Sequence, residues 1–219
     1  MDDQALARLI AVTGPAGSSN AALAAAEARV RTAGLGSCEV ILVEGISDQA
    51  ALESLAARRG RNLGAEGVFV VPMGGATNIQ SFLGLFGPRG LGARAAGLCD
   101  EGEEPAFRRG LERAGFGQVP ARADLERLGF YVCVADLEEE MIRSLGAGAV
   151  ERLIAAEGEH ASWRAFRRQP AQRGRPRDQQ LRRFMGTRSG RKARYARVMA
   201  EALDLTRVPR PLDCVLARV

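Results

Sequence analysis

Residues 40–48 read Val-Ile-Leu-Val-Glu-Gly-Ile-Ser-Asp, so an apolar run leads directly into two acids and a glycine. Consecutive Val, Ile and Leu residues predict a short strand buried on both faces, as in a parallel sheet. Gly45 permits a sharp turn, and Ser47 suits the N-cap of an Ala- and Leu-rich helix. Glu44 and Asp48 would then lie where open α/β sheets bind ligands. The alternative interpretation is an acidic first helical turn that the helix dipole stabilises.

Strand and helix patterns alternate along the next hundred residues. This alternation predicts an α/β fold, a doubly wound parallel sheet of about four strands flanked by helices, followed by a helical C-terminal part. The predicted divisions are a helical segment at 1–36, the α/β core at 37–146 and a basic helical extension at 147–219. The predicted strands are Glu39–Val43, Gly67–Val71, Ala93–Cys99 and Phe130–Ala135. The predicted helices are Asn20–Thr32, Gln49–Arg59, Asn78–Leu85, Pro105–Arg113, Leu137–Leu145, Val150–Glu157 and Lys192–Leu203.

Composition excludes several classes of protein. The chain has 219 residues, of which 46% are hydrophobic, enough for the core of one domain with a helical appendage. No run reaches the roughly 18 apolar residues of a membrane span and no signal peptide is visible, so we expect a cytoplasmic protein without a membrane partner. Four widely spaced cysteines favour free thiols over a zinc site. The glycine-containing segment 13–19 lacks the spacing and the lysine of a phosphate loop, so we expect no ATP site in this chain.

Charge is distributed unevenly along the chain. The net charge is +5, acids cluster at 101–104 and 136–140, and arginines crowd 164–197. Acidic clusters beside a basic surface suit a protein that holds a phosphate backbone, with DNA as the expected partner, although a solvated helical face is the alternative. Lys192 is the only lysine among 31 basic residues. The arginines predicted to contact nucleic acid are Arg173, Arg175 and Arg177, from a Pro- and Gly-rich loop expected to be mobile, and Arg191.

Three of the predicted strands end in acids. The first is followed by Glu44 and Asp48, the third by Asp100, and the fourth by Asp136 and Glu138. If the strands are parallel neighbours, these carboxylates converge at one edge of the sheet and repel one another unless cations bind between them. Oxygen ligands favour hard cations, so we expect Mg²⁺ or Mn²⁺.

These acidic strand ends, together with the glycine loop Gly74-Gly75, resemble a Toprim domain. Asp136-Leu137-Glu138 and the late Lys192 are most similar to the Toprim nuclease region of OLD-family (overcoming lysogenization defect) endonucleases. The resemblance covers residues 38 to about 203 and implies a Toprim core with a C-terminal part that completes the site. It also implies two metal ions, one held by Glu44 and Asp100 and the other by Asp48, Asp136 and Glu138. Glu44 and Lys192 would be the catalytic residues, with Lys192 stabilising negative charge on the phosphate.

Two features depart from that family pattern. The third strand normally carries Asp-x-Asp, whereas this chain reads Asp100-Glu101-Gly102, so Glu103 becomes the candidate replacement ligand. OLD-family proteins usually carry an ATPase domain ahead of the Toprim region, but only about forty residues precede it here, so any ATP dependence is expected to come from a separate ATPase protein. A homodimer is compatible with the resemblance.

The leading functional hypothesis is metal-dependent hydrolysis of DNA by a Toprim endonuclease with a two-metal mechanism. The alternatives are nucleotidyl or phosphoryl transfer on a small nucleotide, and a non-catalytic module that binds nucleic acid. A topoisomerase would need a nucleophilic tyrosine outside the core, and Tyr131 lies within a predicted strand, which leaves only Tyr195.

Overall fold

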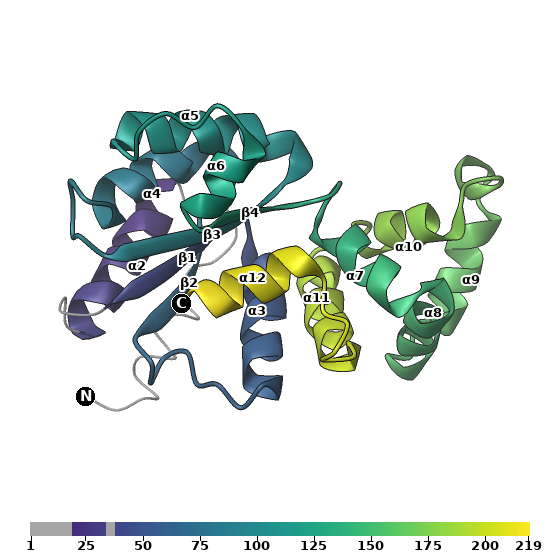
Figure 1. Ribbon diagram of the computed structural model, residues 1–219. Helices are drawn as coiled ribbons and strands as arrows, with labels where there is room; N and C mark the ends of the chain where they lie inside the picture. Colours follow the sequence, from purple (N-terminus) through teal and green to yellow (C-terminus); the bar gives the residue numbers. More distant parts are fainter. Residues whose placement is uncertain (1–18, 34–37) are drawn as a thin grey trace.

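The computed structural model describes residues 19–33 and 38–219 and contains a four-stranded parallel sheet in the order β2-β1-β3-β4 (Figure 1). The predicted α/β class and parallel sheet are therefore confirmed. Three predicted strands agree within a residue or so, whereas the last ends two residues earlier than predicted. The strands are β1 (Glu39–Val43), β2 (Val68–Pro72), β3 (Arg94–Asp100) and β4 (Phe130–Cys133).

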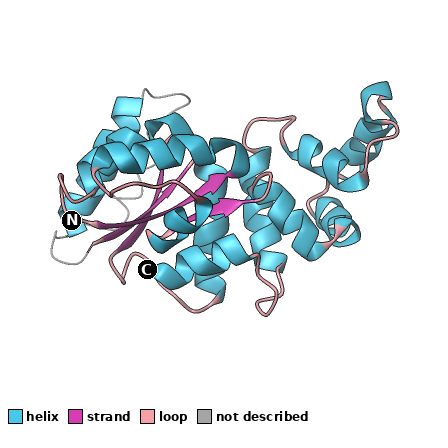
Figure 2. Cartoon of the chain, turned by 45° about the horizontal axis from the view of Figure 1, so that its top comes forward, coloured by secondary structure: helices cyan, strands magenta, loops and turns pink. Residues whose placement is uncertain are grey.

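Helices cover both faces of the sheet, and Figure 2 shows the strands enclosed between them. Because side chains alternate along a strand, Ile41 and Val43 of β1 join one hydrophobic core, and Val40 and Leu42 join the other. The helices that contribute to the Val40 side are α2 (Ser19–Ala33), α4 (Ile79–Phe86), α5 (Glu104–Ala114) and α6 (Arg122–Arg127). Those on the Ile41 side include α3 (Ile46–Arg58), α7 (Leu137–Leu145), α11 (Arg191–Ala202) and α12 (Arg210–Arg218).

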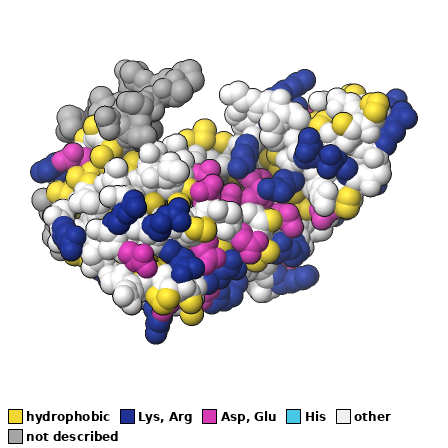
Figure 3. Space-filling view, turned by 90° about the horizontal axis from the view of Figure 1, so that it is seen from above, with side chains coloured by type: hydrophobic (Ala, Val, Ile, Leu, Met, Phe, Trp, Pro, Cys, Tyr) yellow, Lys and Arg dark blue, Asp and Glu magenta, His cyan; other side chains and the backbone are white. Residues whose placement is uncertain are grey.

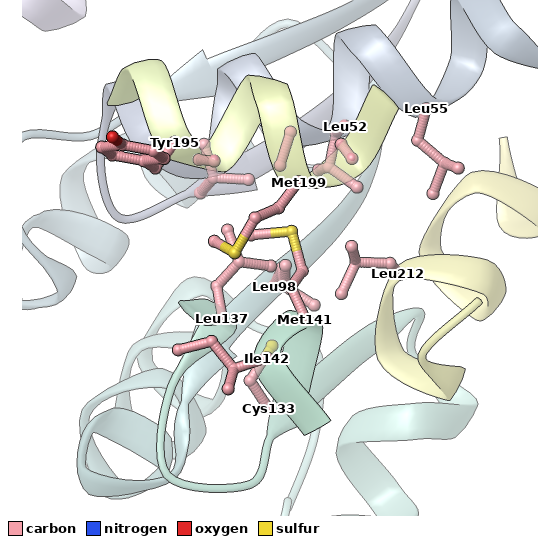
Figure 4. Packing of buried hydrophobic residues seen from close by; sticks show 14 of the residues in the cluster. Leu52, Leu55, Leu98, Cys133, Leu137, Met141, Ile142, Tyr195, Met199 and Leu212 are labelled. Carbon is pink, nitrogen blue, oxygen red and sulfur yellow. The ribbon is translucent and has the colours of Figure 1, made fainter. Parts of the chain in front are cut away.

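The core on the Ile41 side joins segments that are distant in sequence. Figure 4 shows Leu52 of α3, Met141 of α7, Met199 of α11 and Leu212 of α12 packed around Leu98 of β3. All five side chains are almost fully buried. This packing fixes the ends of α7 and α11 relative to the sheet, and therefore fixes the position of the polar residues at those ends.

A helical part extends beyond the sheet at the right of Figure 1. Its aromatic centre consists of Trp163, Phe166 and Phe184. The segment 169–177, predicted to be a mobile loop, forms a turn in which buried Gln180 donates hydrogen bonds to the carbonyls of Gln172 and Arg175 at 2.8 and 3.2 Å, and its mobility stays a prediction. The elements of this part are α8 (Ala147–Ala156), α9 (His160–Arg168), the 3-10 helix η3 (Pro170–Gln172) and α10 (Arg177–Met185).

At the N-terminal end, the predicted helix is confirmed as α2, whereas its predicted glycine stop at 34–36 and nearly all of the segment 13–19 lie outside the described residues. Across 19–33 and 38–219, no helix is both long enough and apolar enough to cross a membrane.

Candidate functional site

The first side of the site is the turn between β1 and α3. The helix begins at Ile46, and the N–H of Gly45 donates a hydrogen bond of 2.8 Å to Oδ2 of Asp48. The N-cap is therefore Gly45, with Asp48 closing the first turn from the third helical position, and the prediction that Ser47 is the N-cap is wrong. The pKa of Asp48 is raised, mainly because the side chain is buried, although the Gly45 hydrogen bond opposes the shift.

The glycine loop after β2 holds the end of β1. Gly74 and Gly75 donate from their backbone N–H groups to the carbonyl of Glu44 at 3.0 and 3.1 Å. Both adopt positive φ, at 72° and 130°, which a side chain would disfavour. The loop is thus both a tight turn and a close backbone contact, and it fixes the main chain at Glu44.

The second and third sides are the ends of β3 and β4. Asp100 is the last residue of β3 and is paired in register with Cys133 at the end of β4. Asp136 caps α7 by accepting the N–H of Glu139 at 2.9 Å. Ala135 precedes it with φ of 64°, a left-handed conformation that ends the strand early. Parallel pairing therefore brings all three acidic strand ends to one edge of the sheet.

Glu138 is the most deeply buried of these acids, with 1% of the residue exposed. Neither of its carboxylate oxygens accepts a well-aligned hydrogen bond, and Oε2 lies 3.1 Å from Nζ of Lys192 at the start of α11. A buried carboxylate with no hydrogen bond is costly unless a cation lies beside it. The lysine amine is half-exposed and supplies that charge on one side only.

The carboxylates form one electrostatic cluster. Burial raises the pKa of Asp100 to about 7, and the charges of Asp48, Asp136, Glu44 and Glu138 add to the shift. Burial likewise raises the pKa of Glu138 to about 7, with Lys192 opposing the shift. The pKa of Glu44 is raised by burial and then by the charge of Asp48.

The end of β3 lacks the second aspartate of the Asp-x-Asp pattern, because Gly102 occupies that position. An added Cβ at Gly102 meets no atom within 4 Å, so the place of the second aspartate is open space. Arg122 pairs with both Glu101 and Glu104, at 3.1 and 2.7 Å. Glu103 is half-buried, and its charge raises the pKa of Glu44, so it faces the cluster.

One residue of the site carries no signal in the sequence. Arg182 of α10 pairs with Asp136, although its side chain is 45% exposed and that of Asp136 only 9%. It is one of thirty arginines, and no local pattern distinguishes it. On the face shown in Figure 3, acidic side chains gather in a band with Lys and Arg side chains around it.

The predicted nucleic-acid-binding arginines are not equivalent. Arg173 and Arg175 are exposed; Arg173 donates to the carbonyl of Arg168 at the end of α9 at 3.1 Å, and Arg175 donates to that of Ala171 within the turn at 2.8 Å. Arg177 is exposed and pairs with Glu151. Arg191 is only 4% exposed, stacks over Phe184 and pairs with Glu159 at 2.9 Å. Arg191 is therefore an interior residue, and the prediction that it contacts DNA is wrong.

The donor set suits a hard divalent cation, because it consists of carboxylates whose mutual repulsion a cation would relieve. The unbonded oxygens of buried Glu138 point to the same need. Among the described residues, however, no three His, Cys, Asp or Glu side chains are already arranged to hold a metal ion. The ion pairs to Lys192 and Arg182 neutralise part of the cluster instead.

The parallel sheet brings acids from three strand ends to one edge, with the glycine loop beside them, as the Toprim resemblance predicts. Residues 37–101 match the family described as "Overcoming lysogenization defect protein-like, TOPRIM domain". This segment of the chain therefore matches a Toprim domain of the OLD-like type.

Solved structures of OLD proteins share the fold. The C-terminal region of the Xanthomonas campestris pv. campestris OLD protein aligns with a TM-score of 0.66 and 22% identity, over 84% of this chain and 92% of that one. The C-terminal region of the Burkholderia pseudomallei OLD protein aligns with a TM-score of 0.61 and 20% identity, over 82% of this chain and 95% of that one. No curated protein sequence matches the chain. At these identities the structural likeness shows the fold alone.

The raised pKa values predict how stability depends on pH in the metal-free protein. The folded state holds protons on Asp100 and Glu138 up to about pH 7, whereas the unfolded chain releases them near pH 4. Their contribution to stability is therefore complete at low pH and is lost as the pH rises through 7. After discounting the partial exposure of Asp100, we expect a loss of about 2 kcal/mol and a fall in Tm of about 4–8 °C between about pH 5 and pH 8.

Calorimetry in the presence of chelator measures this fall. Glu138→Gln should flatten the profile, because the amide does not titrate. A Tm that stays constant or rises over the same interval in the unaltered protein would contradict the pKa assignments.

Proposed function

We propose that this protein hydrolyses phosphodiester bonds of DNA with the help of divalent cations. The observation that supports the proposal is the single cluster of carboxylates from three strand ends, with the amine of Lys192 at its rim. Bound Mg²⁺ or Mn²⁺ would activate the attacking water and neutralise charge at the leaving oxygen. Glu44 and Asp100 would hold one ion, and Asp48, Asp136 and Glu138 the other, with Glu103 as an additional ligand.

The chain's own residues position the phosphate and stabilise its charge. Lys192 is half-exposed beside the cluster, so its amine can contact both Glu138 and a phosphate oxygen that enters the site. A positive charge held there acts most strongly as negative charge develops in the transition state. The fixed backbone at Glu44 keeps that carboxylate at the strand end, which limits the reorganisation needed for reaction.

The test is nicking of supercoiled plasmid by the purified protein with Mg²⁺, Mn²⁺ or chelator, with a mobility-shift assay on the same DNA. We expect nicked circles only with metal. A shift in mobility without nicking under any metal would instead identify a nucleic-acid-binding module. Absence of both would leave transfer on a small nucleotide, assayed with a nucleoside triphosphate. The predicted ATPase partner and homodimer are not addressed by this assay and stay predictions.

The binding-module alternative is favoured by one observation, the glycine at position 102. Because the position is open and its φ is not in the left-handed region, Gly102→Asp can restore the Asp-x-Asp pattern without strain. We expect Mn²⁺ to bind about three- to tenfold more tightly, since one more carboxylate faces the cluster. Calorimetric titration measures the change. Gly102→Asn adds the same bulk without the charge, and an equal gain in both variants would contradict a ligand role for the aspartate.

DNA contact by the 169–177 turn predicts a change in salt dependence. Arg173→Ala with Arg175→Ala should weaken DNA binding several-fold and reduce the slope of log K against log salt by about 1.8, as expected for two lost phosphate contacts. Fluorescence anisotropy at several salt concentrations measures the slope. Arg109→Ala with Arg113→Ala on α5 removes the same charge elsewhere. A slope that changes equally in both pairs would assign the effect to net charge alone.

A further inference from the structure

Arg182 connects the helical part to the carboxylate cluster. It lies on α10, and its guanidinium reaches from an exposed helix surface to the buried carboxylate of Asp136. Oδ2 of Asp136 is the atom that accepts from Arg182, while Oδ1 accepts the Glu139 N–H at 2.9 Å. Each oxygen of this carboxylate is therefore already engaged within the protein.

A metal ion and Arg182 would compete for the negative charge of the Asp136 carboxylate. Asp136 is one of the acids proposed as metal ligands, and it contributes to the raised pKa of Asp100. A divalent cation next to Asp136 would repel the guanidinium and would also replace it as the neutralising charge. The two cannot both hold Oδ2 at full strength. Lys192 differs, because it pairs with Glu138 and leaves Asp136 to Arg182.

The helix that carries Arg182 also supports the basic turn. Phe184, two residues further along the helix, packs against Trp163 of α9 with ring centroids 5.2 Å apart. Gln180, two residues earlier, holds the turn that presents Arg173 and Arg175 through its hydrogen bonds to Gln172 and Arg175. A single helix therefore carries the Asp136 contact and the support of the predicted DNA-contacting turn.

We propose that Arg182 holds Asp136 in the metal-free protein and is exchanged for a divalent cation when the metal site fills. The inference rests on the proposed function, because it takes Asp136 as a metal ligand. The exchange makes metal entry depend on release of the Arg182 side chain from Asp136. The released guanidinium is a planar donor with the geometry that suits phosphate oxygens, so it becomes available to substrate at the same edge of the sheet.

The test is calorimetric titration of the full chain with Mn²⁺ in the absence of DNA. Arg182→Gln removes the competing cation, so we expect Mn²⁺ to bind about tenfold more tightly, the scale of a lost charge-assisted hydrogen bond. Arg183→Gln is the matched control, since it removes the same charge from an exposed position on the same helix and should leave the affinity nearly unchanged. A thermal melt of each variant confirms folding.

A double-mutant comparison separates the effect of the Arg182–Asp136 ion pair on metal binding from the effect of the protein's overall charge. In an Asp136→Asn background, Arg182→Gln should no longer tighten Mn²⁺ binding, because the partner charge is gone. Persistence of the gain in that background would overturn the exchange, as would equal affinity of Arg182→Gln and the unaltered protein. If the unaltered protein binds no Mn²⁺, the proposed function fails and the exchange with it. If the unaltered protein binds Mn²⁺ and Arg182→Gln binds no more tightly, only the exchange fails.

Discussion

Glu44→Gln is expected to lower metal-dependent nicking about a thousandfold or more, the scale on which removal of a catalytic side chain acts. The carboxylate ends β1, and its backbone is fixed by the N–H groups of Gly74 and Gly75. Glutamine keeps the size of the side chain, so the loss isolates the negative charge that would hold and orient a cation. Densitometry of nicked plasmid under multiple-turnover conditions measures the rate.

Glu53→Gln is the matched control for that experiment. Glu53 is exposed on α3, bonds only to Gln49 among the described hydrogen bonds, and lies outside the carboxylate cluster. Its substitution should leave nicking unchanged. Retention of more than about a tenth of the activity in Glu44→Gln would exclude a catalytic role for this residue.

Lys192→Ala is expected to lower the rate of the chemical step by about 10²- to 10³-fold, which is typical of losing one charge that stabilises the transition state. Metal affinity should stay the same or increase, because Lys192 opposes the charge of Glu138 rather than holding the metal. Single-turnover kinetics at saturating Mn²⁺ measures the rate, and calorimetry measures the affinity. Lys192→Arg keeps the charge with a different shape and should recover part of the rate.

The ion pair gives Lys192→Ala a second consequence. Without its amine, buried Glu138 has no ion-pair partner among the described residues, so the pKa of Glu138 should rise further and the metal-free protein should lose stability at alkaline pH. Added Mn²⁺ should restore that stability. Collapse of metal affinity in Lys192→Ala would show that the lysine supports the metal site and would contradict a role confined to the phosphate.

Local sequence predicts the acidic edge because buried parallel strands are continuous apolar runs, and the residues that follow them are fixed by the sheet. Glu44, Asp100 and Asp136 could all be placed in this way. The end of β4 could not, because Ala135 adopts a left-handed conformation that its residue type does not indicate. The predicted N-cap of α3 was also wrong, because the helix begins one residue before Ser47, with Gly45 as its N-cap and Asp48 accepting the Gly45 N–H.

The helical part was harder to predict because arginines conceal its apolar pattern. In α9 only Trp163 and Phe166 are buried, and arginines occupy much of the remaining face. Charge alone assigned Arg191 to the surface, whereas Glu159 and Phe184, both distant in sequence, hold it inside. Arg182 is the opposite case, an exposed arginine that belongs to the site. Its place there depends on one contact with Asp136, which only the tertiary fold creates.

The placement of Trp163 makes the protein its own optical probe. It is the only tryptophan in the chain, and the described partners of its side chain are Glu151, Phe166, Arg167 and Phe184, all within α8, α9 and α10. Fluorescence excited at the red edge of the absorption spectrum, where tryptophan alone absorbs, therefore reports on the helical part. The sheet contributes no emission under these conditions. Loosening of the helical part can thus be followed through a single indole and compared with circular dichroism, which reports on the secondary structure of the whole chain.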